Sequence, residues 1–288
     1  MFVDSHIHLS YRLFNQTFPF IDYEISDDAV EYTTREDMIE RMKTGGIEFC
    51  VEPGIDLESN AFLLSLSEKH SGYILPVVGV HPTRTLDTKW SARKEIEKLS
   101  ERPDVVGIGE LGLDYHYERK KQHRLRQKRW FRWQLKLAHK RKLPLVLHMR
   151  QADRDAIRIL RRYKNKLHGG VCHCFNSDAK TARIFTEELG LMLGIGGSIL
   201  LRSNHLAALE EAVRQTPLEY LLLETDAPYV KPSKPEGISA KKWHKIRNVS
   251  LSITVSAGIF FACRYRPCPN NTSGPSAVPA LCDIFSLL

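Results

Sequence analysis

Short apolar runs alternate with longer amphipathic segments along most of this chain, and few folds accommodate such an alternation. Eight runs are typical of buried strands: Phe2–His6, Glu48–Glu52, Ile74–Val80, Val105–Glu110, Leu145–His148, Gly170–His173, Gly190–Ile195 and Tyr220–Glu224. Between them, apolar residues recur three and four positions apart, as in helices: Thr34–Gly45, Asn60–His70, Ser91–Leu99, Gln122–Arg141, Ala152–Tyr163, Ala179–Leu189 and Leu206–Thr216. Strands that alternate with helices predict a parallel sheet with right-handed crossovers.

Eight such strands in 288 residues favour a closed (β/α)8 barrel of the α/β class, the TIM barrel. No G-x-G-x-x-G motif follows the first run, which counts against an open dinucleotide-binding sheet. We expect residues 1–250 to form one barrel domain. Four prolines, at 267, 269, 275 and 279, interrupt the place where a closing helix would come, so residues 251–288 are expected to be an atypical tail of that domain. Either a compensated frameshift or natural divergence would produce such a tail.

The composition excludes several classes of protein. Six cysteines in a chain of this length are too few for a disulfide-stapled scaffold, and the first ten residues lack the features of a signal peptide. The longest apolar runs are shorter than the roughly 20 residues that cross a bilayer. We therefore expect a cytoplasmic protein, monomeric and without a membrane span.

Positive charge is concentrated in one segment. The 42 basic and 34 acidic residues give a net charge of +8, and twelve of the basic residues lie between Glu118 and Lys142, against one acid. This charge is either a solvated helix face or a track for a polyanion backbone. In the same segment, Trp130, Phe131 and Trp133 have helical spacing and are expected to pack in the core.

Six histidines and acids fall where five of the predicted strands end. They are His6, His8, Glu110, His148, His173 and Asp226. Barrel enzymes carry their chemistry at the carboxyl ends of the strands, and residues two apart on a strand face the same side. Imidazoles and carboxylates bind divalent ions such as Zn, Mn or Mg, and six ligands exceed what one hydrolytic ion takes from a protein. The pattern predicts a site for two divalent metal ions.

Six ordered motifs resemble those of the TatD family of metal-dependent deoxyribonucleases. The motifs are Phe2–His8, Gly79–Pro82, Gly107–Tyr115, Leu143–Arg150, His173–Phe175 and Leu222–Pro228. The resemblance covers about residues 1–250. It implies a barrel of the metallo-dependent hydrolase (amidohydrolase-like) superfamily that hydrolyses phosphodiester bonds in DNA by a two-metal-activated water, with a role in DNA degradation or repair.

The resemblance also implies a role for each residue. His6, His8 and Asp226 would hold one ion, His148 and His173 the other, and Glu110 would bridge the two. Asp226 is the candidate general base, and Glu110 would chiefly support the metal pair. Four further residues are candidate substrate contacts: His81, Tyr115, Arg119 and Arg150.

These patterns leave more than one activity open. An exonuclease that acts on single-stranded DNA or on DNA ends fits the positive charge and the resemblance. A two-metal amidohydrolase or phosphoesterase acting on a small molecule would need the same ligands. A catalytically impaired nucleic-acid-binding protein is the third alternative, and the atypical tail motivates it.

Overall fold

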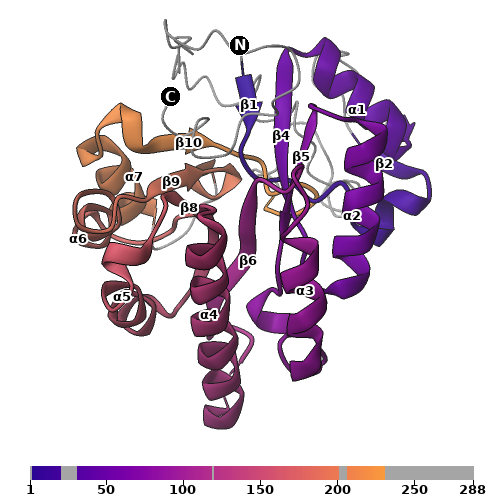
Figure 1. Cartoon of the computed structure of the whole chain (residues 1–288). Helices are drawn as coiled ribbons and strands as arrows, with labels where there is room; N and C mark the ends of the chain where they lie inside the picture. Colours follow the sequence, from indigo (N-terminus) through magenta and orange to yellow (C-terminus); the bar gives the residue numbers. More distant parts are fainter. Residues whose placement is uncertain (1, 21–30, 119, 201–205, 231–288) are drawn as a thin grey trace, which may run out of the picture.

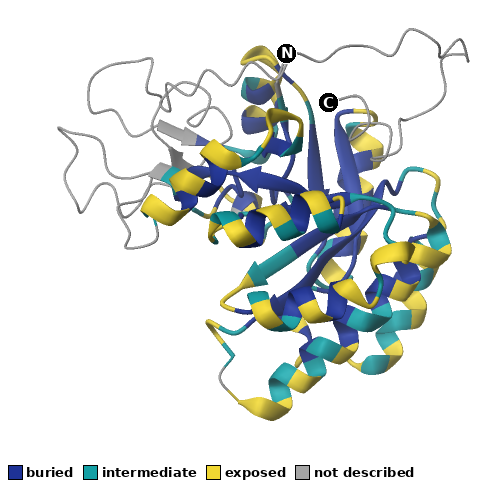
Figure 2. Cartoon of the chain, turned by 90° about the vertical axis from the view of Figure 1, so that its left-hand side faces the viewer, coloured by how far each residue is buried: buried dark blue, intermediate teal, exposed yellow. Residues whose placement is uncertain are grey.

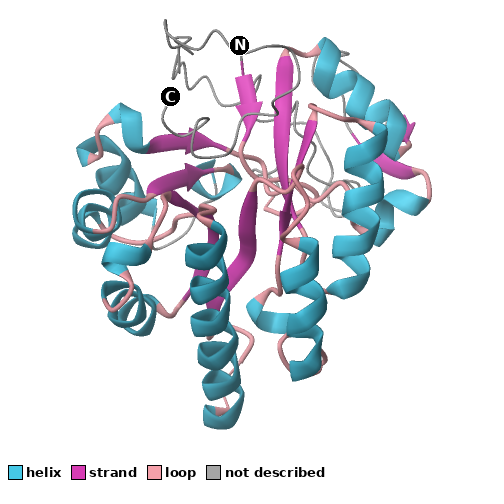
Figure 3. Cartoon of the chain, in the orientation of Figure 1, coloured by secondary structure: helices cyan, strands magenta, loops and turns pink. Residues whose placement is uncertain are grey.

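Eight parallel strands at the centre of the computed structural model curl into a nearly closed barrel (Figures 1 and 3). The structure describes residues 2–20, 31–118, 120–200 and 206–230. The barrel strands are β1 (Phe2–Asp4), β4 (Ile47–Pro53), β5 (Ile74–Val78), β6 (Gly107–Asp114), β7 (Leu145–Arg150), β8 (Gly170–His173), β9 (Met192–Ile195) and β10 (Leu221–Leu223), and they pair in that order. β2 (Phe18–Phe20) and β3 (Glu31–Thr33) form a separate antiparallel pair. The predicted (β/α)8 fold is confirmed.

Helices connect the strands and surround the barrel (Figure 3). The α-helices are α1 (Arg35–Thr44), α2 (Leu57–Lys69), α3 (Arg93–Leu99), α4 (Lys121–Arg141), α5 (Asp153–Arg161), α6 (Ala179–Arg183) and α7 (Leu206–Gln215). A π-helical turn, η5 (Ile184–Glu188), continues α6. The 3-10 turns are η1 (Arg12–Asn15), η2 (Pro82–Arg84), η3 (Trp90–Ala92), η4 (Lys164–Lys166), η6 (Gly197–Leu200) and η7 (Leu218–Tyr220). None of the helices in the described ranges is long and apolar enough to cross a membrane.

The strands are largely buried (Figure 2), and apolar side chains pack on both sides of them. One cluster consists mainly of strand residues and fills the barrel interior: Val51, Leu75, Val77, Val106, Val146, Val171, Met192 and Leu222. A second, larger cluster lies between the strands and the helices. There Trp130 and Phe131 of α4 are buried and Trp133 packs against them, as predicted. This alternation of inward and outward apolar residues is what a parallel barrel requires.

The barrel is closed at its carboxyl end by the segments that follow β1 and β10. Ser5 N donates to Leu223 O at 3.0 Å, Asp226 N donates to His6 O at 2.9 Å, and His8 N donates to Ala227 O at 2.8 Å. The Asp4 carboxylate accepts from Thr225 N at 3.0 Å and from Thr225 Oγ1 at 2.7 Å. We call these hydrogen bonds between Asp4–His8 and Leu223–Ala227 the seam. The seam places the histidines after β1 next to the aspartate after β10.

Strand β6 differs from its predicted boundaries and contains a bulge. The sequence indicated a strand that ends at Glu110, but β6 continues to Asp114. Gly109 pairs with Val146 and Leu111 pairs with Leu147, so Glu110 is an extra residue in the register. A bulge redirects a side chain locally. Glu110 therefore lies within the strand and can still turn its carboxylate to the centre of the barrel.

The predicted division at residue 250 falls on residues 231–288, which lie outside the described part of the chain. The domain boundary and the atypical tail therefore stay predictions.

Candidate metal centre

The barrel brings the six predicted ligands together at the carboxyl ends of its strands. His6 and His8 lie in the turn after β1, Glu110 in the β6 bulge, and His148 near the end of β7. His173 ends β8, and Asp226 lies in the turn after β10. Five of these side chains are buried and His148 is half-buried. Residues that are up to 220 positions apart in the sequence thus share one small, largely buried space.

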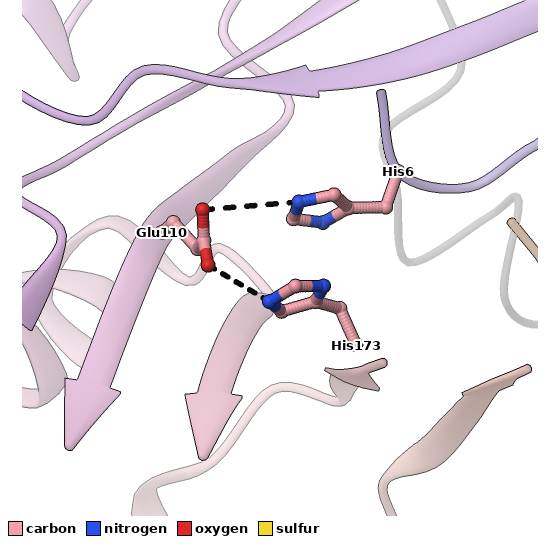
Figure 4. Close-up of side chains that lie close together, drawn as sticks. All are labelled: His6, Glu110 and His173. Atoms are coloured by element: carbon pink, nitrogen blue, oxygen red, sulfur yellow. Dashed lines mark ion pairs between the residues drawn. The ribbon is translucent and has the colours of Figure 1, made fainter. Parts of the chain in front are cut away.

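Glu110 lies at the centre of the cluster, and its two carboxylate oxygens face different partners. Oε1 is 2.8 Å from His148 Nδ1 and 2.8 Å from His173 Nε2. Oε2 is 3.8 Å from His6 Nε2 and 3.6 Å from His8 Nε2. Figure 4 shows the carboxylate between His6 and His173, with one oxygen directed at each. This is the geometry of a carboxylate that can bind two ions at once.

The first group of candidate ligands consists of His6, His8 and Asp226. The Nε2 atoms of the two histidines are 3.2 Å apart, and Asp226 Oδ1 is 3.7 Å from His6 Nε2 and 3.4 Å from His8 Nε2. Asp226 has a φ of 52°, a left-handed conformation that is uncommon outside glycine. Such backbone strain is often found at functional sites.

The second group consists of His148 and His173, with Glu110 between it and the first group. His148 Nδ1 and His173 Nε2 are 2.9 Å apart. The His173 ring also stacks on the His6 ring, with centroids 3.7 Å apart, so the two groups are in contact.

Opposed pKa shifts show how strongly these groups interact. Burial and the neighbouring His173 hold the pKa of His6 well below its usual value. Burial alone would lower the pKa of His173, but the charge and hydrogen bond of Glu110 raise it well above the usual value. Burial alone would raise the pKa of Glu110, yet His81 and His173 hold it well below. The directions of these shifts follow from imidazoles that are buried in contact with one another around one carboxylate.

The donor set fits divalent metal ions. Imidazole nitrogens and carboxylate oxygens are the usual ligands of Zn, Mn and related ions. In each of three groups of residues, the ligand atoms lie within 4.8 Å of one another: His6, Glu110 and His173; His6, His8 and Asp226; His81, Glu110 and His148. Divalent cations bound between these side chains would give the buried imidazole nitrogens and carboxylate oxygens a charged partner. Protons alone satisfy so many buried polar atoms poorly. The residues present thus suit a metal centre.

Buried carboxylates support the candidate ligands from behind. Asp114 Oδ2 is 3.2 Å from His148 Nε2, and Glu224 Oε1 is 3.8 Å from His173 Nδ1. Gly194 leaves room for Glu224, because a Cβ there would lie 2.0 Å from Glu224 Oε2. Carboxylates behind metal-binding histidines fix the ring orientation and tautomer. The Asp4 carboxylate accepts a hydrogen bond from the His6 backbone N at 3.3 Å.

Sequence reasoning missed the supporting role of two acids. Asp114 belongs to the Gly107–Tyr115 motif and shares a strand face with Glu110 by simple alternation, which is a signal that could have found it. Glu52, at the end of β4, is fully buried and accepts a hydrogen bond from Ser10 N, two residues beyond His8. Burial raises the pKa of Glu52 to about 7. Its position at a strand end was the available signal.

The four candidate substrate contacts occupy different places. His81 Nε2 is 3.2 Å from Glu110 Oε1, so His81 lies within the ligand cluster. Arg150 is exposed at the end of β7. The Tyr115 hydroxyl donates to Asp155 Oδ2 at 2.8 Å, on the side of the barrel where α4 and α5 lie. Arg119 is outside the described residues.

Several cations of α4 already have partners within the chain. Arg126 donates to Thr85 O and, at 2.9 Å, to Thr88 O, and Lys128 Nζ is 2.5 Å from Asp155 Oδ2. Lys140 and Arg141 pair with Glu97 and Glu101. These contacts hold α4 to its neighbours and favour the reading of this charge as a partnered, solvated face.

The barrel and its buried imidazole–carboxylate cluster define the class of metal-dependent barrel hydrolases. Comparison with known proteins agrees. Residues 3–257 match the family model described as TatD related DNase. The metal-dependent hydrolase TatD of Mycobacterium tuberculosis, itself called uncharacterized, is 32% identical over 240 residues, which are 82% of this chain and 83% of the relative. The chain therefore belongs to the TatD-related DNase family.

Two further comparisons concern an exonuclease and a solved structure. A protein of Rahnella sp. named 3'-5' ssDNA/RNA exonuclease TatD is 32% identical over 205 residues, which are 70% of this chain and 76% of the relative. The crystal structure of YJJV, a TatD homologue of Escherichia coli, has a TM-score of 0.67 and 27% identity, and covers 82% of this chain and 83% of its own. The name of the Rahnella protein states an exonuclease activity of that relative. The similarity to the Escherichia coli structure supports the fold and family of this chain.

Proposed function

We propose that this protein is a divalent-metal-dependent exonuclease that hydrolyses phosphodiester bonds in DNA, with single strands or ends as its substrate. The observation that carries the proposal is the position of Glu110, whose two oxygens face His148 and His173 on one side and His6 and His8 on the other. One carboxylate between two sets of ligands suits a pair of ions. We assign His6, His8 and Asp226 to one ion, His148 and His173 to the other, and Glu110 to both.

The chain's own residues supply the remaining chemistry. When bound, two divalent ions would clamp a phosphate and lower the pKa of a water molecule toward neutrality. Asp226 is our candidate general base, because its carboxylate lies at the edge of the cluster beside His8. His81 is close enough to the cluster to contact the phosphate, and Arg150 can contact it from the rim of the barrel.

A nucleic-acid substrate is supported by charge and by relatives. The chain has a net charge of +8, which favours polyanions. Two relatives carry the name 3'-5' ssDNA/RNA exonuclease TatD, from Rahnella sp. and Pantoea ananatis. We propose that this chain likewise removes nucleotides from an end, as a monomer in the cytoplasm.

Digestion of end-labelled oligonucleotides tests the proposal. The full chain is freed of metal, then supplied with Mg, Mn or Zn and with DNA or RNA that carries a 5' label. We expect the labelled strand to shorten one nucleotide at a time, EDTA to stop the reaction, and excess metal to restore it. Elemental analysis should find two ions per chain.

The Glu110→Ala variant is the inactive control for this assay. We expect this variant to keep its helix and strand content by circular dichroism but to lose at least ~1,000-fold in turnover, as expected when a metal site that activates water is dismantled. Cleavage that chelator does not reduce would contradict the metal assignment. Hydrolysis of small amides or phosphoesters without cleavage of DNA would favour the amidohydrolase alternative, and binding of DNA without cleavage the impaired binding protein.

A further inference from the structure

We propose that Tyr117 and Arg150 form a nucleobase-binding site at the rim of the metal centre, which stacks an unpaired base next to the scissile phosphate. This inference rests on the proposed function and identifies the residues that would select single-stranded substrate. Neither the sequence motifs nor the cluster of ligands assigns a role to Tyr117.

Tyr117 is far more exposed than packing would require. The residue is 68% exposed, the largest value among the exposed large hydrophobic residues of the described part of the chain. It lies in the loop after β6, between Asp114 and α4, at the end of the barrel where the ligands gather. An exposed ring at the mouth of a candidate nuclease site is available to a base, because every base offers a π-face for stacking.

The loop that carries Tyr117 is tied to the metal centre through Asp114. Asp114 Oδ1 accepts hydrogen bonds from His116 N at 2.9 Å and from Tyr117 N at 3.1 Å. The other oxygen, Oδ2, is 3.2 Å from His148 Nε2. A single buried carboxylate therefore separates the Tyr117 backbone from a candidate metal ligand, so the ring has a defined place relative to the reaction centre.

Arg150 adds a cation to the same place. Its guanidinium carbon is 5.0 Å from the centre of the Tyr117 ring, which is within the range of a cation–π contact. Arg150 follows His148 by two residues on β7, so the cation and the ligand come from one strand. The guanidinium keeps the ring in position and can bind the phosphate of the stacked nucleotide.

Neighbouring tyrosines are less suited to this role. The Tyr115 hydroxyl is bonded to Asp155, and Arg124 lies over its ring at 4.2 Å. Tyr229 is 42% exposed, and its ring contacts those of His8 and Tyr11. The Tyr117 ring also has neighbours, the Arg150 guanidinium and the His116 ring, whose centroid is 4.8 Å away edge-on, but Tyr117 stays more exposed than Tyr115 or Tyr229.

The site predicts a preference for single strands. In a duplex the bases already stack on one another, and removing one from the stack costs a few kcal/mol. An unpaired base can lie on Tyr117 without that cost. We therefore expect Tyr117 to contribute to the affinity for single-stranded and not for duplex substrate.

Binding and cleavage test the inference separately. Binding is measured with a single-stranded DNA that carries 2-aminopurine at its 3' end. The buffer contains calcium or chelator, so that the measurement does not depend on hydrolysis of the DNA. Stacking on Tyr117 should quench the fluorescence. Tyr117→Ala should abolish the quenching and weaken binding about 10-fold, within the usual range for one stacked base, and Tyr117→Phe should restore both.

Cleavage is then compared on a normal strand and on one with an abasic terminal nucleotide. Tyr117→Ala should raise KM about 10-fold on the normal strand, with a smaller change in kcat. The gap between wild type and variant should shrink on the abasic strand, which has no base to stack. Phe62→Ala is the matched control, since Phe62 is an exposed ring of α2 with the Arg35 guanidinium 4.7 Å away.

The outcomes separate this inference from the proposed function. If wild type cleaves single strands and Tyr117→Ala binds and cleaves them like wild type, the base site is wrong and the nuclease stands. If wild type cleaves no nucleic acid but Tyr117→Ala loses the quenching, the nuclease is wrong and the base site stands. Equal loss in Phe62→Ala, or equal gaps on normal and abasic strands, would also overturn the base site.

Discussion

Asp114 divides its carboxylate between two tasks. One oxygen faces His148 Nε2 and the other holds the Tyr117 loop. Because Nε2 is occupied in this way, His148 presents Nδ1 to Glu110 and His173. The pKa of Asp114, which burial alone would raise, is lowered by His148, so the carboxylate stays ionised. A charged acceptor fixes the tautomer that a metal ligand needs.

Asp114→Asn should therefore weaken metal binding without unfolding the protein. An amide can turn its NH₂ toward His148 or toward the backbone N–H groups of the loop, and either choice loses one acceptor. We expect a ~10- to 100-fold loss in metal affinity, measured by competition with a chelating dye. Asp104→Asn is the control, since Asp104 pairs with Arg102. Equal affinities in wild type and Asp114→Asn would contradict the role.

Strand alternation and the strand ends predicted that the six candidate ligands meet on one face, and the structure brings them together there, while their roles stay predictions. The substrate contact predicted for His81 stays a prediction, and the structure adds that His81 Nε2 lies 3.2 Å from Glu110 Oε1. No pattern in the residues could reveal that distance, or the bulge that turns Glu110 inward. Both depend on how neighbouring strands pair.

Asp155 of α5 links three elements of the outer layer. It accepts a hydrogen bond from the Tyr115 hydroxyl and pairs with Lys128 of α4 and Arg158 of α5. Burial alone would raise the pKa of Asp155, but the hydrogen bonds from Lys128 and Tyr115 lower it from 3.8 to about 2. A depressed pKa means that the charged form stabilises the fold above the unfolded pKa and that this contribution is lost as the pH falls.

Asp155→Asn should accordingly cost stability in a pH-dependent way. Above about pH 5 we expect a constant loss of about 1 kcal/mol in the free energy of unfolding, the upper end for a partly exposed pair. The loss should shrink as the pH falls from about 4 to about 2, where the wild-type carboxylate becomes protonated. Urea unfolding of metal-free protein at pH 7 and pH 3 measures this. An undiminished gap at pH 3 would contradict the prediction.

Helices were predicted well because their periodicity and their caps agree. The predicted Thr34–Gly45 contains α1 (Arg35–Thr44), with Thr34 and Asp37 forming a capping box and Gly45 as the C-cap. The basic segment was also predicted as a helix, but its partners were not. Whether Lys128 or Arg126 faces a polyanion or a neighbouring helix depends on tertiary packing.

At the scale of the whole molecule, the order of the strands follows the order of the chain. The alternation of strands and helices predicted this arrangement, since right-handed crossovers leave few other topologies. How the first and last strands meet could not be predicted. The seam depends on the Asp4 carboxylate, whose partner Thr225 is 221 residues away.

Removing Asp4 should loosen the barrel and its site together. Asp4→Ala leaves Thr225 N and Oγ1 without their buried acceptor, and we expect a loss of about 3 kcal/mol in the free energy of unfolding. Ser5→Ala removes one neutral hydrogen bond of the seam, to Leu223 O, and should cost about 1 kcal/mol. Urea unfolding gives both values. Equal losses in the two variants would contradict the central role of Asp4.

The seam also constrains how this protein can change over evolutionary time. The segments that join the two ends of the barrel carry His6, His8 and Asp226, so an insertion in either segment would shift ligands relative to one another. Insertions after β9 would leave those three residues in place. We therefore expect natural variation in length to accumulate in such connections. In the first eight residues and the turn after β10, we expect a change in one segment to be accompanied by a change in the other.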